Sequence, residues 1–152
     1  MTKPENASGD GVPGSRRNKL DNSSGQQQTS ADAAKQREYD LEERTARFGE
    51  AIIHFAKRVR VNPVTERLIV QLVGAATSVG ANYGEADDAG SKKEFLHRIS
   101  LCKRESRESK HWLRMIVAAA PELKDEARVH WQEAKELNLI FGAIHRGKRG
   151  KP

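Results

Sequence analysis

Apolar side chains recur at every third or fourth residue in four successive segments between residues 39 and 146. This spacing places them along one face of an α-helix, which turns by about 100° per residue. The four stripes are Leu41, Phe48, Ile52, Phe55 and Val59, with Thr45 in the gap; Leu68, Leu72, Ala75 and Val79; Phe95, Ile99, Cys102, Leu113 and Ile116, with the small residues Ser106 and Ser109 in the gap; and Leu123, Ala127, Ala134, Leu137, Phe141 and Ile144, with His130 in the gap and facing the core. No segment alternates with a period of two over a useful length, so the pattern predicts helices and no sheet.

Short breaks separate the four stripes. Asn62-Pro63 is expected to end the first helix and start the second, because proline is tolerated in a first turn but not inside a helix. Gly80-Ala-Asn-Tyr-Gly84 is expected to end the second helix, and Ser91-Lys-Lys-Glu94 has the capping-box pattern that starts a third. Helices joined by short connections run antiparallel, so the expected fold is all-α, an up-down-up-down four-helix bundle.

The chain divides near residue 38. Residues 1–38 are rich in Gly, Ser, Asn and Gln and contain no aromatic residue. Their apolar side chains are too few to offset the entropy of ordering the backbone, so we expect a disordered N-terminal tail. The bundle then spans residues 39–146, and residues 147–152 form a basic C-terminal end.

One flank of the third helix is basic, although the formal net charge of the chain is a moderate +6. The simplest interpretation is a solvated helix face with local ion pairs and no binding role. The alternative is a surface that follows phosphates without reading bases, which gives salt-dependent and sequence-tolerant binding. That alternative makes the segregated cations candidate nucleic-acid-binding residues: Lys92, Lys103, Arg107, Lys110 and Arg114, with Arg146, Lys148 and Arg149 near the C-terminus.

The opposite flank of the third helix is acidic and aromatic, with Glu94, Glu105 and Glu108 beside Trp112. A tryptophan at the edge of a stripe covers the rim of its own bundle or anchors a neighbouring subunit, where aromatic residues are favoured. The second interpretation predicts an oligomer interface formed by Glu105, Trp112, Asn82 and Tyr83.

The sequence lacks the residue constellations of an enzyme. Ser100-Leu-Cys-Lys103 has the spelling of some acyl enzymes, but no Ser-Asp-Asn or Lys-Thr-Gly sequence accompanies it. The five histidines show no zinc-protease spacing, and a single cysteine leaves no paired-thiol zinc site. We therefore expect no catalytic residue, no cofactor and no metal.

Several features bear on location. The chain has no apolar run long enough to cross a membrane and no apolar signal segment at its N-terminus. The lone cysteine fits a reducing compartment, so we expect a cytoplasmic protein with no membrane partner.

A family resemblance covers about residues 39–146 and rests on an ordered series of motifs. They are Tyr39-Asp-Leu-Glu-Glu-Arg-Thr, Ser78-Val-Gly-Ala-Asn-Tyr83 with Glu85-Ala86, and Ser91-Lys-Lys-Glu-Phe95 followed by Lys103-Arg-Glu-Ser-Arg-Glu-Ser-Lys-His-Trp-Leu113. This series resembles the four-helix-bundle protein family, also called the ribosomal RNA intervening-sequence protein family. Gly84 departs from the family pattern, which has a larger apolar residue after Ala-Asn-Tyr.

The resemblance carries expectations of its own. Members of this family are similar to the accessory proteins of diversity-generating retroelements, which form ring-shaped homopentamers, bind nucleic acid through a basic surface and bind the reverse transcriptase of the element. The resemblance thus implies an antiparallel bundle that forms a homo-oligomer, with RNA or DNA and a reverse transcriptase as partners. The leading hypothesis is a non-catalytic, nucleic-acid-binding accessory protein, and the alternative is a protein-protein interaction scaffold that binds no nucleic acid.

Overall fold

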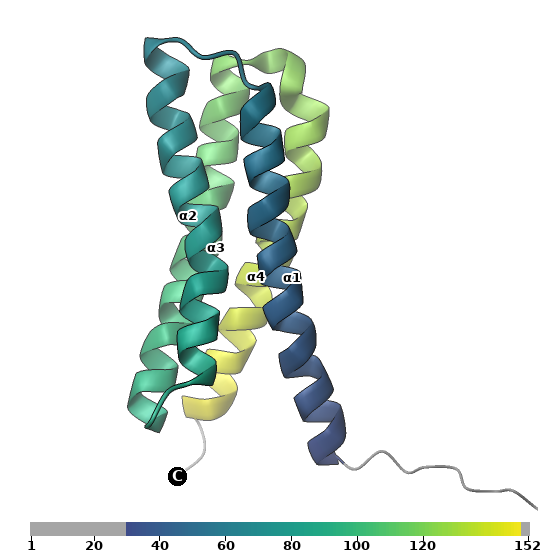
Figure 1. Ribbon diagram of the computed structural model, residues 1–152, viewed down its shortest axis with the longest axis vertical. Coiled ribbons are helices and arrows are strands. Elements are labelled where there is room, and N and C mark those ends of the chain that lie inside the picture. Colours follow the sequence, from purple (N-terminus) through teal and green to yellow (C-terminus); the bar gives the residue numbers. More distant parts are fainter. Residues whose placement is uncertain (1–29, 150–152) are drawn as a thin grey trace, which may run out of the picture.

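A computed structural model describes the backbone of residues 30–149, together with the side chains of Asp32 and of residues 41–149 (Figure 1). The described residues form four long helices and one short 3₁₀ turn: α1 (Ser30–Arg58), α2 (Pro63–Asp87), α3 (Lys92–Ala119), η1 (Pro121–Leu123) and α4 (Lys124–Arg149). Each helix runs antiparallel to the one before it (Figure 1). The predicted up-down-up-down bundle is confirmed.

The first helix is longer than the apolar stripe predicts. It begins at Ser30, so residues 30–38 are helical and do not belong to the predicted tail. This segment contains Ala31, Ala33 and Ala34, and alanine has the highest helix propensity. Asp32 lies in the first turn, where a negative charge favours the helix dipole. The rest of the predicted tail, residues 1–29, lies outside the described residues.

The fourth helix is also longer than predicted, since it continues past residue 146 to Arg149. Basic residues in a last turn suit the negative end of the helix dipole, and Arg146, Lys148 and Arg149 all lie there. Residues 150–152 of the predicted basic end lie outside the described residues.

The predicted end of the second helix at residues 80–84 is wrong, because α2 continues through both glycines to Asp87. The buried stripe explains this: Val79, Tyr83 and Ala86 extend it at helical spacing into the core. A glycine in a helix interior lowers the stability of the helix by about 1 kcal/mol relative to alanine. Burial of three side chains outweighs that cost, since tertiary packing supplies most helical stability in proteins.

Gly84→Ala tests this correction. A Cβ built at residue 84 meets no atom within 4 Å, so alanine fits the helix without a clash. We expect the free energy of unfolding to rise by about 0.5–1 kcal/mol, because glycine loses more backbone entropy on folding than alanine does. Urea denaturation measures the change, and Gly74→Ala, which is equally unobstructed, is the matched control. A loss of stability in Gly84→Ala alone would instead indicate a left-handed cap at this residue.

Both predicted helix starts carry side-chain caps. The Asn62 side chain accepts a hydrogen bond from the Thr65 amide at 3.0 Å, and the Thr65 hydroxyl accepts one from the Asn62 amide at 2.9 Å. At α3, the Ser91 hydroxyl accepts from the Glu94 amide at 3.1 Å. The Glu94 carboxylate accepts from the Gly90 amide at 3.2 Å, one residue before the position that a reciprocal capping box uses.

The core runs along the whole bundle. Its largest fully buried side chains include Phe55, Phe141, Ile52, Leu72, Ile99, Leu113, Ile116 and Leu137, all from the predicted stripes. Small buried residues, among them Ala76, Cys102 and Ser106, let α2 and α3 pack closely. The Ser106 hydroxyl donates to the Cys102 carbonyl of its own helix at 2.8 Å, so its polar group is satisfied within α3 and the side chain packs in the core.

Candidate nucleic-acid interface

The predicted basic flank of α3 lies on the surface of the bundle. Lys103, Arg107 and Arg114 are exposed, and Lys110 is half-buried. Lys92, in the first turn of α3, is exposed as well. The apolar stripe of α3 points inward, so its cations point away from the core.

Contacts with α4 show which surface these cations occupy. The Lys110 ammonium lies 5.1 Å from the ring centroid of Trp131. The Asn138 side chain donates to the Lys103 carbonyl at 2.8 Å. The Cβ position of Gly142 in α4 lies 3.7 Å from Cε of Lys103, which is an ordinary van der Waals distance, so the lysine side chain lies against α4. The basic flank of α3 therefore lies along the seam between α3 and α4.

The fourth helix adds cations of its own to this seam. The Lys135 ammonium lies 5.8 Å from the Trp131 ring centroid, on the residue that Lys110 also contacts. A guanidinium nitrogen of Arg146 lies 3.3 Å from the Cβ position of Gly142. At about 100° per residue, Lys124, Arg128 and Arg149 share this flank of α4. We call the combined surface the α3–α4 band: Lys103, Arg107, Lys110 and Arg114 of α3, and Lys124, Arg128, Lys135, Arg146 and Arg149 of α4.

Sequence reasoning missed part of this band. It did not identify Lys124, Arg128, Trp131 or Lys135. The three cations follow one another at spacings of four and seven residues, which is one face of a helix. That periodicity was a usable signal, but it does not reveal which neighbouring helix the face meets.

Ion pairs occur on other surfaces of the bundle. Arg44 of α1 holds Glu133 of α4 through two hydrogen bonds of 2.7 and 2.9 Å, and the bond to Glu133 contributes most to raising the pKa of Arg44. Arg58 pairs with Glu126, again between α1 and α4. Within residues 41–149, no cation of the α3–α4 band is paired with a carboxylate.

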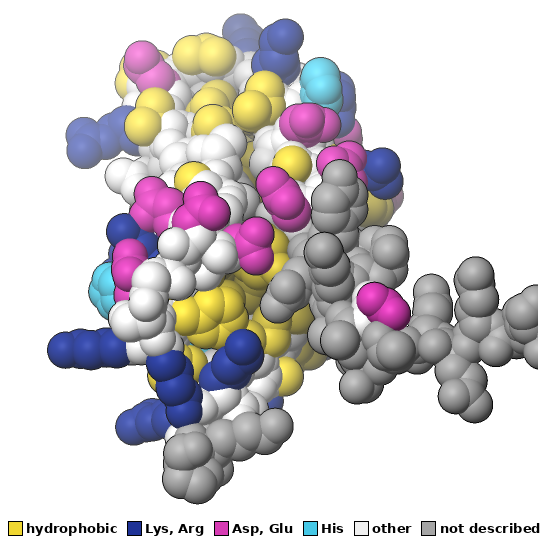
Figure 2. Space-filling view, turned by 60° about the horizontal axis from the view of Figure 1, so that its bottom comes forward, with side chains coloured by type: hydrophobic (Ala, Val, Ile, Leu, Met, Phe, Trp, Pro, Cys, Tyr) yellow, Lys and Arg dark blue, Asp and Glu magenta, His cyan; other side chains and the backbone are white. Residues whose placement is uncertain are grey.

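Charged side chains are unevenly distributed over one face of the molecule. Figure 2 shows Lys and Arg side chains gathered around exposed apolar atoms at the lower end of the molecule, while Asp and Glu gather higher on the same face. The lower end is where α3 begins and α4 finishes (Figure 1). Lys148 also lies at this end of the bundle, where its ammonium is 4.6 Å from the Phe95 ring centroid. It is therefore not counted in the α3–α4 band.

The predicted oligomer-interface residues do not form one exposed patch. Trp112 is half-buried and meets His111 edge-on, with ring centroids 4.8 Å apart. The Glu105 side chain is 14% exposed and lies 3.4 Å from Arg104. Asn82 is half-buried, and its amide donates to the Ser78 carbonyl at 2.9 Å.

The predicted place of Tyr83 in the turn that ends the second helix is wrong. Tyr83 lies inside α2, is 4% exposed and packs against Phe141 with ring centroids 6.0 Å apart. The reason is the continuation of α2, which carries the Tyr83 ring into the core. Its side chain therefore stabilises its own protomer.

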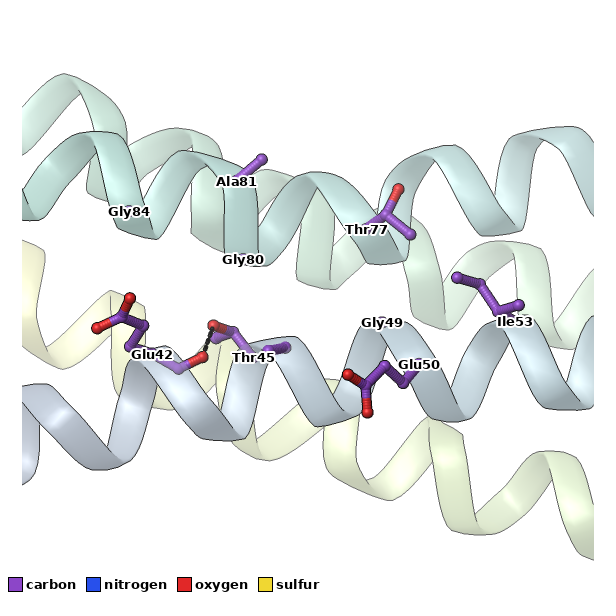
Figure 3. A pocket seen from close by; sticks show the side chains of 10 residues that line it. Glu42, Thr45, Gly49, Glu50, Ile53, Thr77, Gly80, Ala81 and Gly84 are labelled. Atoms are coloured by element: carbon purple, nitrogen blue, oxygen red, sulfur yellow. Dashed lines mark hydrogen bonds between the residues drawn. The ribbon is translucent and has the colours of Figure 1, made fainter.

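A groove of about 350 Å³ lies between α1 and α2 (Figure 3). Small residues such as Gly49, Gly80 and Ala81 line it, and Glu42 and Glu50 are its only acidic lining residues. The hydroxyl of Thr45 donates to the Glu42 carbonyl at 3.0 Å, so the helix backbone already uses it. Its small lining residues make the groove a packing surface between α1 and α2.

No group of three His, Cys, Asp or Glu side chains in the described part of the chain is placed to hold a metal ion. No helix among residues 30–149 is both long and apolar enough to cross a membrane. His130, predicted to face the core, is half-buried with its ring centroid 5.2 Å from that of Phe55, and burial lowers its pKa.

Together, the fold and the surface define a four-helix bundle with a basic band along one seam. No protein-family model matches the chain, and no curated protein sequence matches it. A solved structure shares the fold: a protein of unknown function from the S23 ribosomal protein family of Bacteroides thetaiotaomicron. It superposes with a TM-score of 0.63 and 20% sequence identity, over 72% of this chain and 97% of that one. A likeness at this identity shows the helical fold alone.

Proposed function

We propose that this protein is a non-catalytic accessory protein that binds nucleic acid through the α3–α4 band. The observation that carries the proposal is a set of cations on one surface without a paired carboxylate among residues 41–149. Unpaired lysines and arginines attract a polyanion, and binding gains free energy because condensed counterions leave the phosphates. Phosphate contacts carry no sequence information, so we expect the binding to tolerate changes of sequence.

We further propose that the chain is a distant, homo-oligomeric member of the ribosomal RNA intervening-sequence protein family. The ordered motifs of residues 39–113 and the shared fold of the S23-family protein support this membership. A ring of subunits would sum the field of each band, so a moderate charge per chain becomes a strong attraction for RNA or DNA. A reverse transcriptase is a partner to test on the same grounds.

Reversing two charges of the band tests the proposal. Lys110→Glu combined with Arg114→Glu is expected to weaken the binding of a labelled RNA by more than about tenfold at low salt, because attraction becomes repulsion at two phosphate contacts. Fluorescence anisotropy measures the affinity, and light scattering measures the mass of the assembly. The matched control is Lys57→Glu with Arg67→Glu, which alters the net charge equally on exposed residues outside the band. It should bind within about twofold of the wild type.

The same experiment separates a second candidate function, a scaffold for protein-protein contacts. Trp112 and Glu108 favour it, since both lie on the flank of α3 opposite the band and retain exposed surface. In that case the band meets the acidic flank of the next subunit, as head-to-tail rings require. Dissociation of the double variant into monomers, with no nucleic acid bound by the wild type, would support the scaffold and contradict nucleic-acid binding.

A further inference from the structure

Trp131 lies inside the α3–α4 band. Its side chain is half-buried: part of it packs against the core, and part reaches the surface of the seam. The ammonium groups of Lys110 and Lys135 lie 5.1 and 5.8 Å from its ring centroid. The two lysines come from different helices, so the indole lies where both sides of the band meet.

This arrangement matches the chemistry that recognises unpaired nucleotides. A cation–π contact that keeps access to water is weak, and lysine has a long flexible stem. Lys110 and Lys135 can therefore move from the indole to phosphates at little cost. The uncovered ring then offers a stacking surface to a base, and every base has a π-face.

A duplex does not use such a site. Its bases are stacked and paired, so an indole set between two packed helices cannot reach a base face. A single strand can turn one base toward Trp131 while its backbone follows the band. The α3 side of the band, from Lys103 to Arg114, rises about 16 Å along the helix at 1.5 Å per residue, which gives the backbone several successive contacts.

We infer that the α3–α4 band binds a single-stranded polynucleotide, with one base stacked on Trp131 and flanking phosphates held by Lys110 and Lys135. This inference rests on the proposed function and specifies its ligand. RNA and DNA share the chemistry that the site recognises, because stacking and phosphate contacts need no 2′-hydroxyl.

The fluorescence of Trp131 tests the stacking directly. Trp112→Phe leaves Trp131 as the only tryptophan, and titration with oligothymidylate or oligouridylate of about 12 nucleotides should quench its emission. Trp131→Phe leaves Trp112 as the only tryptophan, on the other flank of α3, and its emission should stay constant. Comparing the two oligonucleotides distinguishes DNA from RNA as the preferred strand. Constant emission of Trp131 in a complex shown by anisotropy to have formed would overturn the inference.

Affinity supplies an independent measurement on the unaltered protein. An abasic strand of the same length keeps the phosphates and removes the bases, so it should bind about 5- to 150-fold more weakly than oligothymidylate. Trp131→Leu should abolish that difference, and its helical circular dichroism reports whether it folds. The double-stranded form should also bind more weakly than the single strand.

The outcomes distinguish this inference from the function on which it rests. Equal affinity for the normal strand, the abasic strand and the duplex, together with loss of binding in Lys110→Glu/Arg114→Glu, would overturn base stacking and leave nucleic-acid binding intact. No binding of any of the three by the wild type would overturn the proposed function itself.

Discussion

Phe141→Ala is expected to lower the free energy of unfolding by about 3–5 kcal/mol, the usual cost of removing a buried aromatic side chain. Phe141 is fully buried in α4 and packs against Tyr83 of α2. Alanine would leave a cavity where two helices meet, and the surrounding side chains relax only partly into it. Because whole domains are stable by only about 5–15 kcal/mol, this single change should remove a large share of the total. Urea denaturation followed by circular dichroism measures it.

Leu139→Ala is the matched control for this prediction. Leu139 lies two residues away on the same helix but is 60% exposed. Its replacement should change the free energy of unfolding by no more than about 0.5 kcal/mol, as surface substitutions usually do. Equal effects of the two changes would show that a different face of α4 is turned toward the core. The position of the α3–α4 band would then be wrong as well.

Nucleic-acid affinity is expected to fall by about 50-fold between 50 and 200 mM salt. This follows if each protomer neutralises about four phosphates, since each contact on a single strand contributes about −0.7 to the slope of log K against log salt. Arg107→Ala with Lys110→Ala and Arg114→Ala should make that slope shallower by about 2, because three contacts are lost. Anisotropy titrations at four salt concentrations measure both slopes.

Neutralising Lys57, Arg60 and Arg67 provides the control, because it removes the same charge from exposed residues outside the band. The slope of this variant should equal that of the wild type. If both triple variants lose slope equally, the attraction comes from net charge and not from the band. A wild-type affinity that is insensitive to salt would contradict phosphate binding altogether.

The fold was predictable because burial leaves a periodic trace in the sequence. Ile52, Leu72, Leu113 and Leu137 stand at helical spacing within their own segments, and all four are buried. The end of α2 was not predictable from local signals. Gly80 and Gly84 favour a break, whereas the burial of Val79, Tyr83 and Ala86, with Tyr83 against the distant Phe141, favours continuation of the helix.

The candidate site was half predictable for a related reason. Spacing along α3 assigns Lys103 and Lys110 to one flank, whatever lies beside it. The pairing of Lys110 with Trp131 depends on how α4 is aligned against α3, and the bond from Asn138 to the Lys103 carbonyl is part of that alignment. Helical periodicity carries no information about the relative shift of two helices.

The close packing of α2 on α3 has a practical consequence for thiol chemistry. Cys102 is fully buried, and its sulfur lies 3.5 Å from the Val79 carbonyl. Burial raises the pKa of the thiol to about 12, so almost none of it is thiolate at neutral pH. Maleimide and iodoacetamide reagents should therefore not react with Cys102 in the native protein. A cysteine introduced at an exposed residue would be the sole reactive thiol, which allows fluorophores or photo-crosslinkers to be attached to any chosen surface of the bundle without first removing Cys102.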